Sequence, residues 1–351
     1  MPNSVQLPLL LALPLAVATG LAMPVQGRIN GALGAALGDG LAAALISFGT
    51  GLAVVAVISA VLPAGRAGLR QVLPALRGRR FPRWYLLAGC LGAFMVFSQG
   101  LAVPVLGIAL FTVATVAGTA VSGLLVDRLG LGPGGSQPVT LLRAVSALLA
   151  VAGVAWAVSP KLGAGSAAAW LLPVLLPLLA GFLRSFQQAM NAAQSVHYGN
   201  PFTATLINFI VGTTVLAALW GIKCAVAGAG HPLPAQWWLY LGGAMGTVFL
   251  VLANMLVRSL GVLLAGLSTI AGQVLGSLVL DLLFPAAGTQ VGAASVLGTL
   301  LTLAAMVLAT LPWTPAARVR PAAAFLAVRE KVREEAREKA QEKVPQKELR
   351  C

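Results

Sequence analysis

The sequence predicts an all-α polytopic membrane protein with ten transmembrane helices, arranged as two inverted five-helix repeats. Two observations support this fold class. The composition suits a chain surrounded by lipid, because 58% of the 351 residues are hydrophobic and only 9% are charged, whereas soluble domains carry roughly 25% charged residues. In addition, two segments occur once in each half of the chain, which is typical of transporters built from duplicated units.

Uncharged apolar runs define the expected helices. A hydrocarbon core of about 30 Å requires around 20 helical residues, and the runs lack the alternating pattern of membrane strands. The first stretch has no basic n-region, so it is expected to be a retained helix and not a signal peptide. The expected spans are 8–36, 41–63, 84–103, 105–126, 139–158, 168–197, 202–222, 237–257, 260–282 and 291–312.

The duplication is visible at constant spacing. Residues 26–51 align with 187–212 at a shift of 161 without a gap, and residues 84–127 align with 238–281 at a shift of 154. The identical pairs include Gln26/Gln187, Asn30/Asn191, Phe48/Phe209, Gly51/Gly212, Gly89/Gly243, Gly118/Gly272 and Asp127/Asp281. We therefore expect equivalent helices in the two halves.

Positive charge predicts the orientation of these helices. The loop after the second span contains six arginines and no acid, which places it in the cytoplasm by the positive-inside rule. Those residues are Arg66, Arg70, Arg77, Arg79, Arg80 and Arg83. The corresponding loop of the second half has only Lys223 and His231. Because each repeat also has an odd number of spans, the copies are expected to lie inverted in the membrane, with both termini cytoplasmic.

The predicted organisation is a first repeat at 1–160, a second at 161–315 and a charged tail at 316–351. Glutamates in the tail recur at intervals of four beside arginines, a spacing that favours a solvated helix. We expect a soluble cytoplasmic extension, with attraction to anionic lipid or to a partner as the alternative. The net charge of +14 lies in this tail and in loops beside the membrane, so no nucleic-acid partner is expected.

Acidic and metal-binding residues are too scattered for an enzyme. Outside the tail the acids are Asp39, Asp127 and Asp281, and the two histidines and three cysteines have no ligand spacing. No nucleophile–base set, paired carboxylates or phosphate-binding loop can be assembled. The sequence therefore predicts no enzymatic activity, no cofactor and no metal.

Polar side chains in the first and sixth spans are the main candidates for a substrate path. Gln26 and Asn30 share a helix face, as do Gln187, Asn191 and Gln194. Such groups normally face a partner helix or a wet cavity, and interhelical hydrogen bonding is the alternative reading. The full candidate set is Gln26, Arg28, Asn30, Arg184, Gln187, Asn191, Gln194, Ser47 and Asn208. Weaker candidates for the cavity wall are Thr50, Gln99, Thr115, Thr119, Asn254, Thr269 and Gln273.

Arg28 and Arg184 differ from the rest of this set, because the equivalent positions hold Ala189 and Met23. If the two arginines face the cavity, they favour anionic substrate groups over cationic ones. The alternative is that each reaches the headgroups along its aliphatic stem.

Two repeat-related acids, Asp127 and Asp281, lie at the ends of the fourth and ninth spans. They are candidate gate residues, and the alternative is that they satisfy donors at the membrane interface. In the same spans, Gly272 and Gly276 form a GxxxG pair that suits close helix packing. A homodimer through the fourth or ninth span is the lesser interpretation of these glycines.

The repeated run Q-x-x-x-N followed by G-D/N and A-x-L-I-S/N-F, with the paired GxxG helices and the two aspartates, resembles the YdcZ-like branch of the drug/metabolite transporter superfamily. The resemblance covers about residues 7–312 and is to the fused, double-repeat form. It implies a bacterial inner membrane protein and alternating-access transport of small metabolites or drugs, often as export. The glutamate that the small multidrug relatives carry in their first helix is missing here. A lipid or lipid-linked sugar translocator and a membrane scaffold remain the alternative functions.

Overall fold

The computed structural model describes residues 9–133, 135–136, 138–162, 167–285 and 292–310, and most side chains within 250–267 are left out of the description. The chain divides into two units, Met1–Leu311 and Pro312–Cys351. The second unit contains the charged tail, so the predictions for the tail fall outside the described residues. All that follows concerns the first unit.

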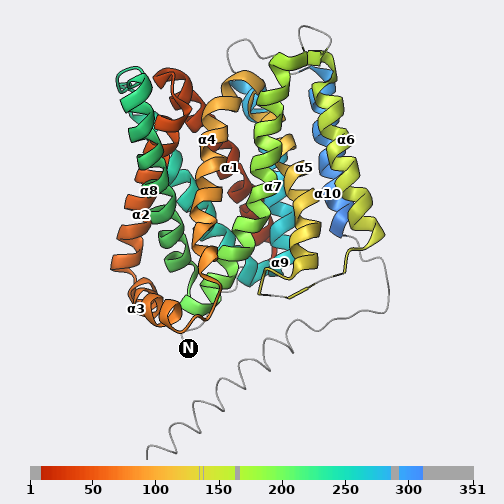
Figure 1. Cartoon of the computed structure of the whole chain (residues 1–351). Coiled ribbons are helices and arrows are strands. Elements are labelled where there is room, and N and C mark those ends of the chain that lie inside the picture. Colours follow the sequence, from red (N-terminus) through yellow and green to blue (C-terminus); the bar gives the residue numbers. More distant parts are fainter. Residues whose placement is uncertain (1–8, 134, 137, 163–166, 286–291, 311–351) are drawn as a thin grey trace, which may run out of the picture. The chain divides into compact units, whose positions relative to one another are not determined.

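The described residues form a bundle of ten α-helices and two 3₁₀-helices, without a strand among them (Figure 1). In chain order the elements are α1 (Leu9–Leu37), α2 (Gly40–Val61), α3 (Pro63–Arg77), η1 (Arg83–Leu87), α4 (Ala88–Leu106), α5 (Ile108–Leu129), α6 (Leu141–Leu162), α7 (Ala167–Tyr198), α8 (Pro201–Ala227), η2 (Trp237–Tyr240), α9 (Gly242–Leu283) and α10 (Ala293–Thr310).

Six of these helical segments are long and apolar enough to cross a membrane on their own, as judged from the described residues. They are α2, η1 with α4, α5, α6, α7 and α8. Large apolar side chains point outward from the bundle, and Val57, Leu148 and Leu172 are 62%, 70% and 65% exposed. An outer surface of this kind suits hydrocarbon as the surrounding solvent.

One helix was not among the expected spans. The segment expected as a cytoplasmic loop after the second span contains α3, which begins at Pro63. Proline suits the first turn of a helix because its missing N–H is not needed there. Leu69, Leu73 and Leu76 repeat at helical spacing between the arginines, so α3 is amphipathic. The connection between the second and third spans therefore contains a helix that the sequence analysis did not predict.

The predicted spans at 237–257 and 260–282 fall within a single helical element, α9. A straight helix of that length would measure about 63 Å, yet both of its ends contact the shorter α1. In chain order the contacts pair Gly246 with Gln26, Leu256 with Ala12 and Ala16, Gly272 with Val17, and Gly276 with Leu21. Along the first part of α9 the residue numbers of the contacts in α1 fall, and along the last part they rise. The two parts of α9 therefore pack along α1 in opposite directions, the first antiparallel and the second parallel to it.

Equivalent helices of the two halves pack antiparallel to each other. Between α2 and α8, Gly51 contacts the Phe209 ring and Gly212 contacts the Phe48 ring, and the two rings lie 5.0 Å apart. Between α6 and α10, Gly153 contacts Thr302 while Gly298 contacts Ala157. In both pairs the residue numbers rise along one helix as they fall along the other.

Glycines bring backbones of opposite halves into direct contact, and each contact has a repeat-related counterpart. A Cβ added to Gly118 would lie 2.1 Å from the Leu178 carbonyl oxygen, and one added to Gly272 would lie 2.0 Å from the Val17 oxygen. The complementary contacts join Gly181 to Thr115 and Gly20 to Thr269. These glycines therefore serve packing within one chain, and a homodimer through these helices stays a prediction.

We expect Gly181→Ala to destabilise the bundle, because its Cβ would lie 2.0 Å from the Thr115 carbonyl oxygen. Overpacking of this kind costs about 1–3 kcal/mol. Gly49→Ala is the matched control, because nothing lies within 4 Å of the added atom and alanine favours a helix interior by up to about 1 kcal/mol. Melting temperatures of the detergent-solubilised proteins test this, and equal melting of the two variants would contradict it.

Candidate functional site

The same capped turn begins the second helix of each half. Asp39 Oδ1 accepts hydrogen bonds from the backbone N–H groups of Leu41 and Ala42 at 3.0 and 3.1 Å. Asn200 Oδ1 accepts from the N–H of Thr203 at 2.9 Å. The residue before each cap is a glycine with a positive φ, 59° at position 38 and 77° at position 199, where side chains are disfavoured. These turns fix how α1 and α7 meet their neighbours.

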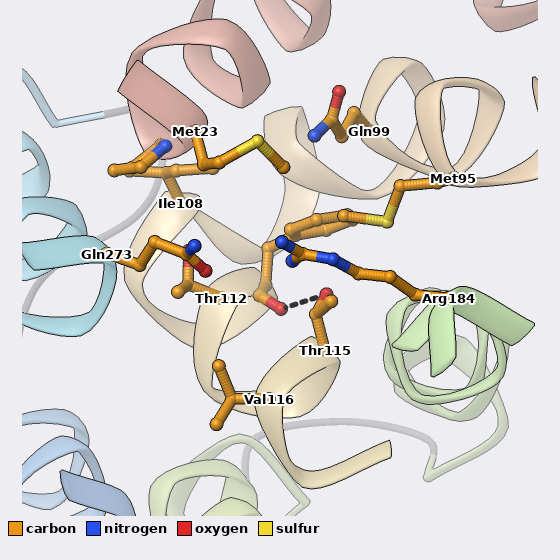
Figure 2. A pocket seen from close by; sticks show the side chains of 11 residues that line it. Met23, Met95, Gln99, Ile108, Thr112, Thr115, Val116, Arg184 and Gln273 are labelled. Atoms are coloured by element: carbon orange, nitrogen blue, oxygen red, sulfur yellow. Dashed lines mark hydrogen bonds between the residues drawn. The ribbon is translucent and has the colours of Figure 1, made fainter. Parts of the chain in front are cut away.

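Three cavities converge on Arg184 of α7. Their volumes are about 20, 170 and 270 Å³, and Arg184 lines all of them. The smallest lies between α1, α4, α5, α7 and α9, and Figure 2 shows Arg184 extending from its helix toward Thr112 and Gln273. The three spaces therefore meet at one cationic side chain.

Arg184 lies at the middle of the apolar segment Trp170–Tyr198, where a charge is costly in lipid. Among the described residues its guanidinium has no ion pair. Asp127 and Asp39 pair with Arg143 and Lys223 instead. Arg184 is thus a cation at membrane depth that faces internal cavities and has no carboxylate of the described bundle beside it.

The cavity of about 170 Å³ is bordered by an amide cluster from the second half of the chain. Gln187 Nε2 and Asn191 Nδ2 both donate to Asn208 Oδ1, at 3.1 and 3.2 Å. Asn191 Oδ1 is buried without a hydrogen-bond partner among the described residues. An acceptor left unpaired in a buried place costs free energy, so this oxygen is available to a bound molecule.

The corresponding polar cluster in the first half, around Asn30, is more deeply buried than the cluster around Asn208. Asn30 is fully buried and its Nδ2 donates to Gln99 Oε1 at 2.7 Å. A Cβ on Gly242 would lie 2.1 Å from Asn30 Oδ1 and 3.2 Å from Ser47 Oγ. Both oxygens are buried and unpaired within the described part of the chain.

Six of the nine predicted substrate-path residues line the cavity of about 170 Å³. They are Gln26, Ser47, Arg184, Gln187, Asn191 and Asn208. Asn30 lies behind this wall against Gln99. Gln194 is buried and donates to the Tyr85 carbonyl oxygen at 2.9 Å, and Arg28 lines none of the three cavities. The polar faces of α1 and α7 thus meet at this cavity, but each face has one residue, Asn30 or Gln194, that does not line it.

The apolar walls of the cavities were missed by sequence reasoning. Phe249, Ile270 and Met306 line the largest cavity, but apolar residues carry no signal in an apolar chain. Gln188 belongs to the polar set of the sixth predicted span but was not among the nine candidates, and it lines two of the cavities. Of the weaker candidates, Gln99, Thr115, Thr119, Thr269 and Gln273 line cavities, and the side chain of Asn254 is outside the described residues.

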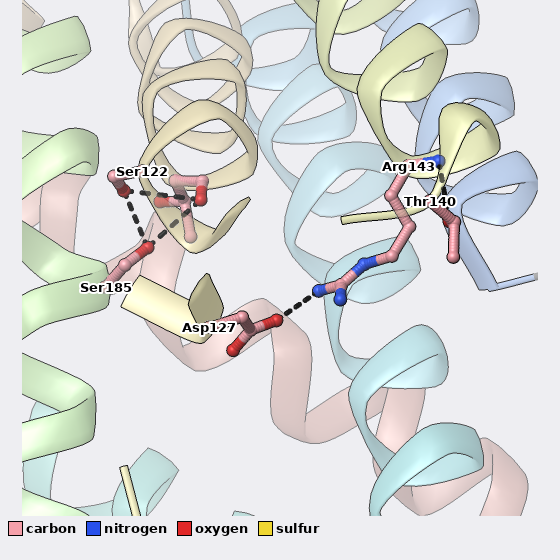
Figure 3. Close-up of polar contacts among 6 residues, drawn as sticks. Ser122, Asp127, Thr140, Arg143 and Ser185 are labelled. Carbon is pink, nitrogen blue, oxygen red and sulfur yellow. Dashed lines mark hydrogen bonds and ion pairs between the residues drawn. The ribbon is translucent and has the colours of Figure 1, made fainter. Parts of the chain in front are cut away.

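The two repeat-related aspartates make different contacts. Asp127 of α5 forms an ion pair with Arg143 of α6 (Figure 3). Asp281 of α9 is 4% exposed and accepts hydrogen bonds from the N–H groups of Ile108 and Ala109, at 3.0 and 2.8 Å. A carboxylate at a helix N-terminus is stabilised by the helix dipole. Asp281 therefore caps a helix of the other half, whereas Asp127 stays within its own half.

Only a glycine can occupy the position between α4 and α5. Gly107 has a φ of 81°, and a Cβ there would lie 2.5 Å from Asp281 Oδ2. A side chain would be strained and would also displace the carboxylate from the start of α5.

Lys223 of α8 closes the end of the bundle where α1 meets α2. Its Nζ donates to Asp39 Oδ2 at 2.8 Å, and the His231 N–H donates to the Leu37 carbonyl oxygen at 2.8 Å. Burial raises the pKa of Asp39. The hydrogen bond and charge of Lys223, together with the Leu41 and Ala42 N–H groups, outweigh burial and hold the pKa below its ordinary value of 3.8.

The family model described as "Putative inner membrane exporter, YdcZ" matches residues 11–156 and 172–308, which is more than half of the chain. The chain belongs to this family. The two matched regions agree with the double-repeat form expected from the sequence. None of the curated proteins matches the chain at a significant level. Within the described residues, no three His, Cys, Asp or Glu side chains gather as a metal site would require.

We expect Asp39→Asn to lower stability at pH 7 by roughly 0.5–1 kcal/mol. The substitution removes the ion pair with Lys223 but keeps a side-chain oxygen that can cap the helix, as Asn200 does at the equivalent turn. The folded pKa of Asp39 lies below the unfolded one. The contribution is therefore present above about pH 4 and is lost as the pH falls through the folded pKa. Melting temperatures between pH 3 and pH 7 should converge at the acidic end. A difference in melting temperature between wild type and Asp39→Asn that stays constant from pH 7 to pH 3 would contradict this.

Proposed function

We propose that the protein exports a small metabolite or drug by alternating access of two inverted five-helix repeats. In this proposal α9 contributes two spans, α3 lies at the membrane surface, and the bundle has ten spans. The arginine-rich segment around α3 faces the cytoplasm of a bacterium, as do both termini. Membership of an inner membrane exporter family supports the general function.

Paired contacts between the halves support the inverted arrangement. The α2–α8 and α6–α10 pairs run antiparallel, as helices related by a two-fold axis in the membrane plane would. The Gly118–Leu178 contact has its counterpart in Gly272–Val17 at the equivalent repeat positions. A repeated interface of this kind supports rocking of one half against the other.

The position of the amide-lined cavity is the observation that carries the proposal. Gln26 and Ser47 from the first half face the same space as Gln187, Asn191 and Asn208 from the second. Binding sites of inverted-repeat transporters lie near the bilayer midplane, where the repeats meet. We propose that these residues with Arg184 form the substrate path, and that Asn30 and Gln194 support it from outside the cavity. Arg28 lines none of the three cavities, and in this proposal it reaches the headgroups along its aliphatic stem and takes no part in the path.

Of the two gating candidates, we assign the larger role to Asp281. Its carboxylate links α9 to the start of α5, and so joins one half to the other. Rocking of the halves would change that contact. The Asp127–Arg143 pair lies within the first half and would move as a unit.

The direct experiment is export by purified protein in proteoliposomes, with a panel of small labelled solutes inside the vesicles and with or without a proton gradient. The proposal expects saturable efflux of at least one panel member above the rate of protein-free vesicles. Absence of efflux for anionic, neutral and cationic members alike would contradict it.

We expect Asn208→Leu to reduce efflux of the transported solute by about tenfold or more, because it removes the acceptor shared by Gln187 and Asn191. Thr214→Val on the same helix is the control. Thr214 is exposed, and its hydroxyl bonds only the Ile210 carbonyl oxygen of its own helix among the described residues. Equal efflux by the two variants at matched folded protein would argue against a substrate path at Asn208.

A further inference from the structure

We propose that the central cavity binds a small organic monoanion, with its oxyanion head at Arg184 and its apolar body in the cavity of about 270 Å³. This inference rests on the proposed export function, because it assigns a chemical class to the molecule that occupies the same cavity. Carboxylates and sulfonates share the required head chemistry.

The charge of the site is set by one residue. The three acids that precede the tail are occupied elsewhere: Asp39 by Lys223, Asp127 by Arg143, and Asp281 by the N–H groups that begin α5. A guanidinium at membrane depth is costly without a counter-charge. A bound anion supplies that counter-charge, whereas a cationic molecule would be repelled by the same side chain.

The polar groups around Arg184 can complete the recognition of an oxyanion. Gln188 and Gln273 line the cavity of about 270 Å³ together with Arg184, and neither amide has a hydrogen-bond partner among the described residues. An amide N–H₂ supplies two donors, and the guanidinium fork matches the spacing of two oxyanion oxygens. With a single cation in this arrangement, a head of one negative charge is the best match.

The rest of the lining of this cavity favours a ligand whose uncharged part is apolar. Phe249, Ile270, Met306 and Val116 line the same cavity, and its volume lies below the range of about 300–1,000 Å³ typical of drug-sized ligands. The ligand is therefore compact, with roughly one ring or a short aliphatic chain attached to the charged head.

The test uses two probes of similar body and opposite permanent charge, benzenesulfonate and phenyltrimethylammonium. Efflux of each is measured from proteoliposomes that contain the full-length protein. In detergent, the rise in melting temperature with each probe reports binding without any need for transport. The variants are Arg184→Gln, Arg184→Lys, and Arg28→Gln as the control, because Arg28 lines none of the three cavities.

We expect wild type to prefer benzenesulfonate by about tenfold or more in efflux, and to be stabilised by it but not by the cation. Arg184→Gln should remove this preference, Arg184→Lys should keep most of it, and Arg28→Gln should leave it unchanged. If Arg184→Gln does not fold, the proposal is tested by two other results. These are the preference of the wild-type protein for benzenesulfonate and the preference that Arg184→Lys retains.

Equal or stronger stabilisation by phenyltrimethylammonium would overturn the proposal, as would a preference that survives Arg184→Gln or is lost equally in Arg28→Gln. Efflux of neutral or cationic solutes without efflux or binding of benzenesulfonate would overturn the anion assignment and leave the export function intact. Absence of efflux for every solute would remove the export function, and the melting measurements would then decide the anion site alone.

Discussion

Backbone contact at glycines between the two halves is the constraint on which the rest of this structure depends. Gly181 lies against the Thr115 carbonyl and Gly20 against that of Thr269, at equivalent positions of the two repeats. Because lipid provides little hydrophobic drive for helices to associate, close packing through small residues has to supply the attraction. Any larger side chain there would separate α7 from α5, or α1 from α9.

That packing also decides where the polar groups go. Once α1 and α7 are held against helices of the opposite half, their amide faces point to the centre of the bundle and away from lipid. The hydrogen bonds of Gln187 and Asn191 to Asn208 follow from this placement. Arg184 is the group that the arrangement leaves without a charged partner in the described bundle, so the electrostatic character of the cavity depends on one side chain.

Much of this architecture could be predicted because duplication and hydropathy are local properties of a sequence. Most helix positions, and the convergence of Gln26 and Ser47 with Gln187, Asn191 and Asn208, followed from the repeat and from helical periodicity. Two separate spans were expected at 237–257 and 260–282, and their opposite directions agree with the contacts of α9 along α1. Nothing in the hydropathy indicated that the two spans form one continuous helical element. The partners of Asp127 and Asp281 were also hidden. The two acids occupy equivalent positions, but tertiary packing gives one an arginine and the other a helix N-terminus.

The central claim is that a water-accessible path between the halves reaches the middle of the membrane. Labelling by a membrane-impermeant thiol reagent tests it most directly, with Gln188→Cys in a protein whose three native cysteines are replaced by alanine. Leu179→Cys on the same helix is the control, because Leu179 is 48% exposed but lines none of the three cavities. The account predicts labelling at 188 in both inside-out and right-side-out vesicles, and none at 179. Failure to label 188 from either side, or equal labelling of both positions, would contradict it.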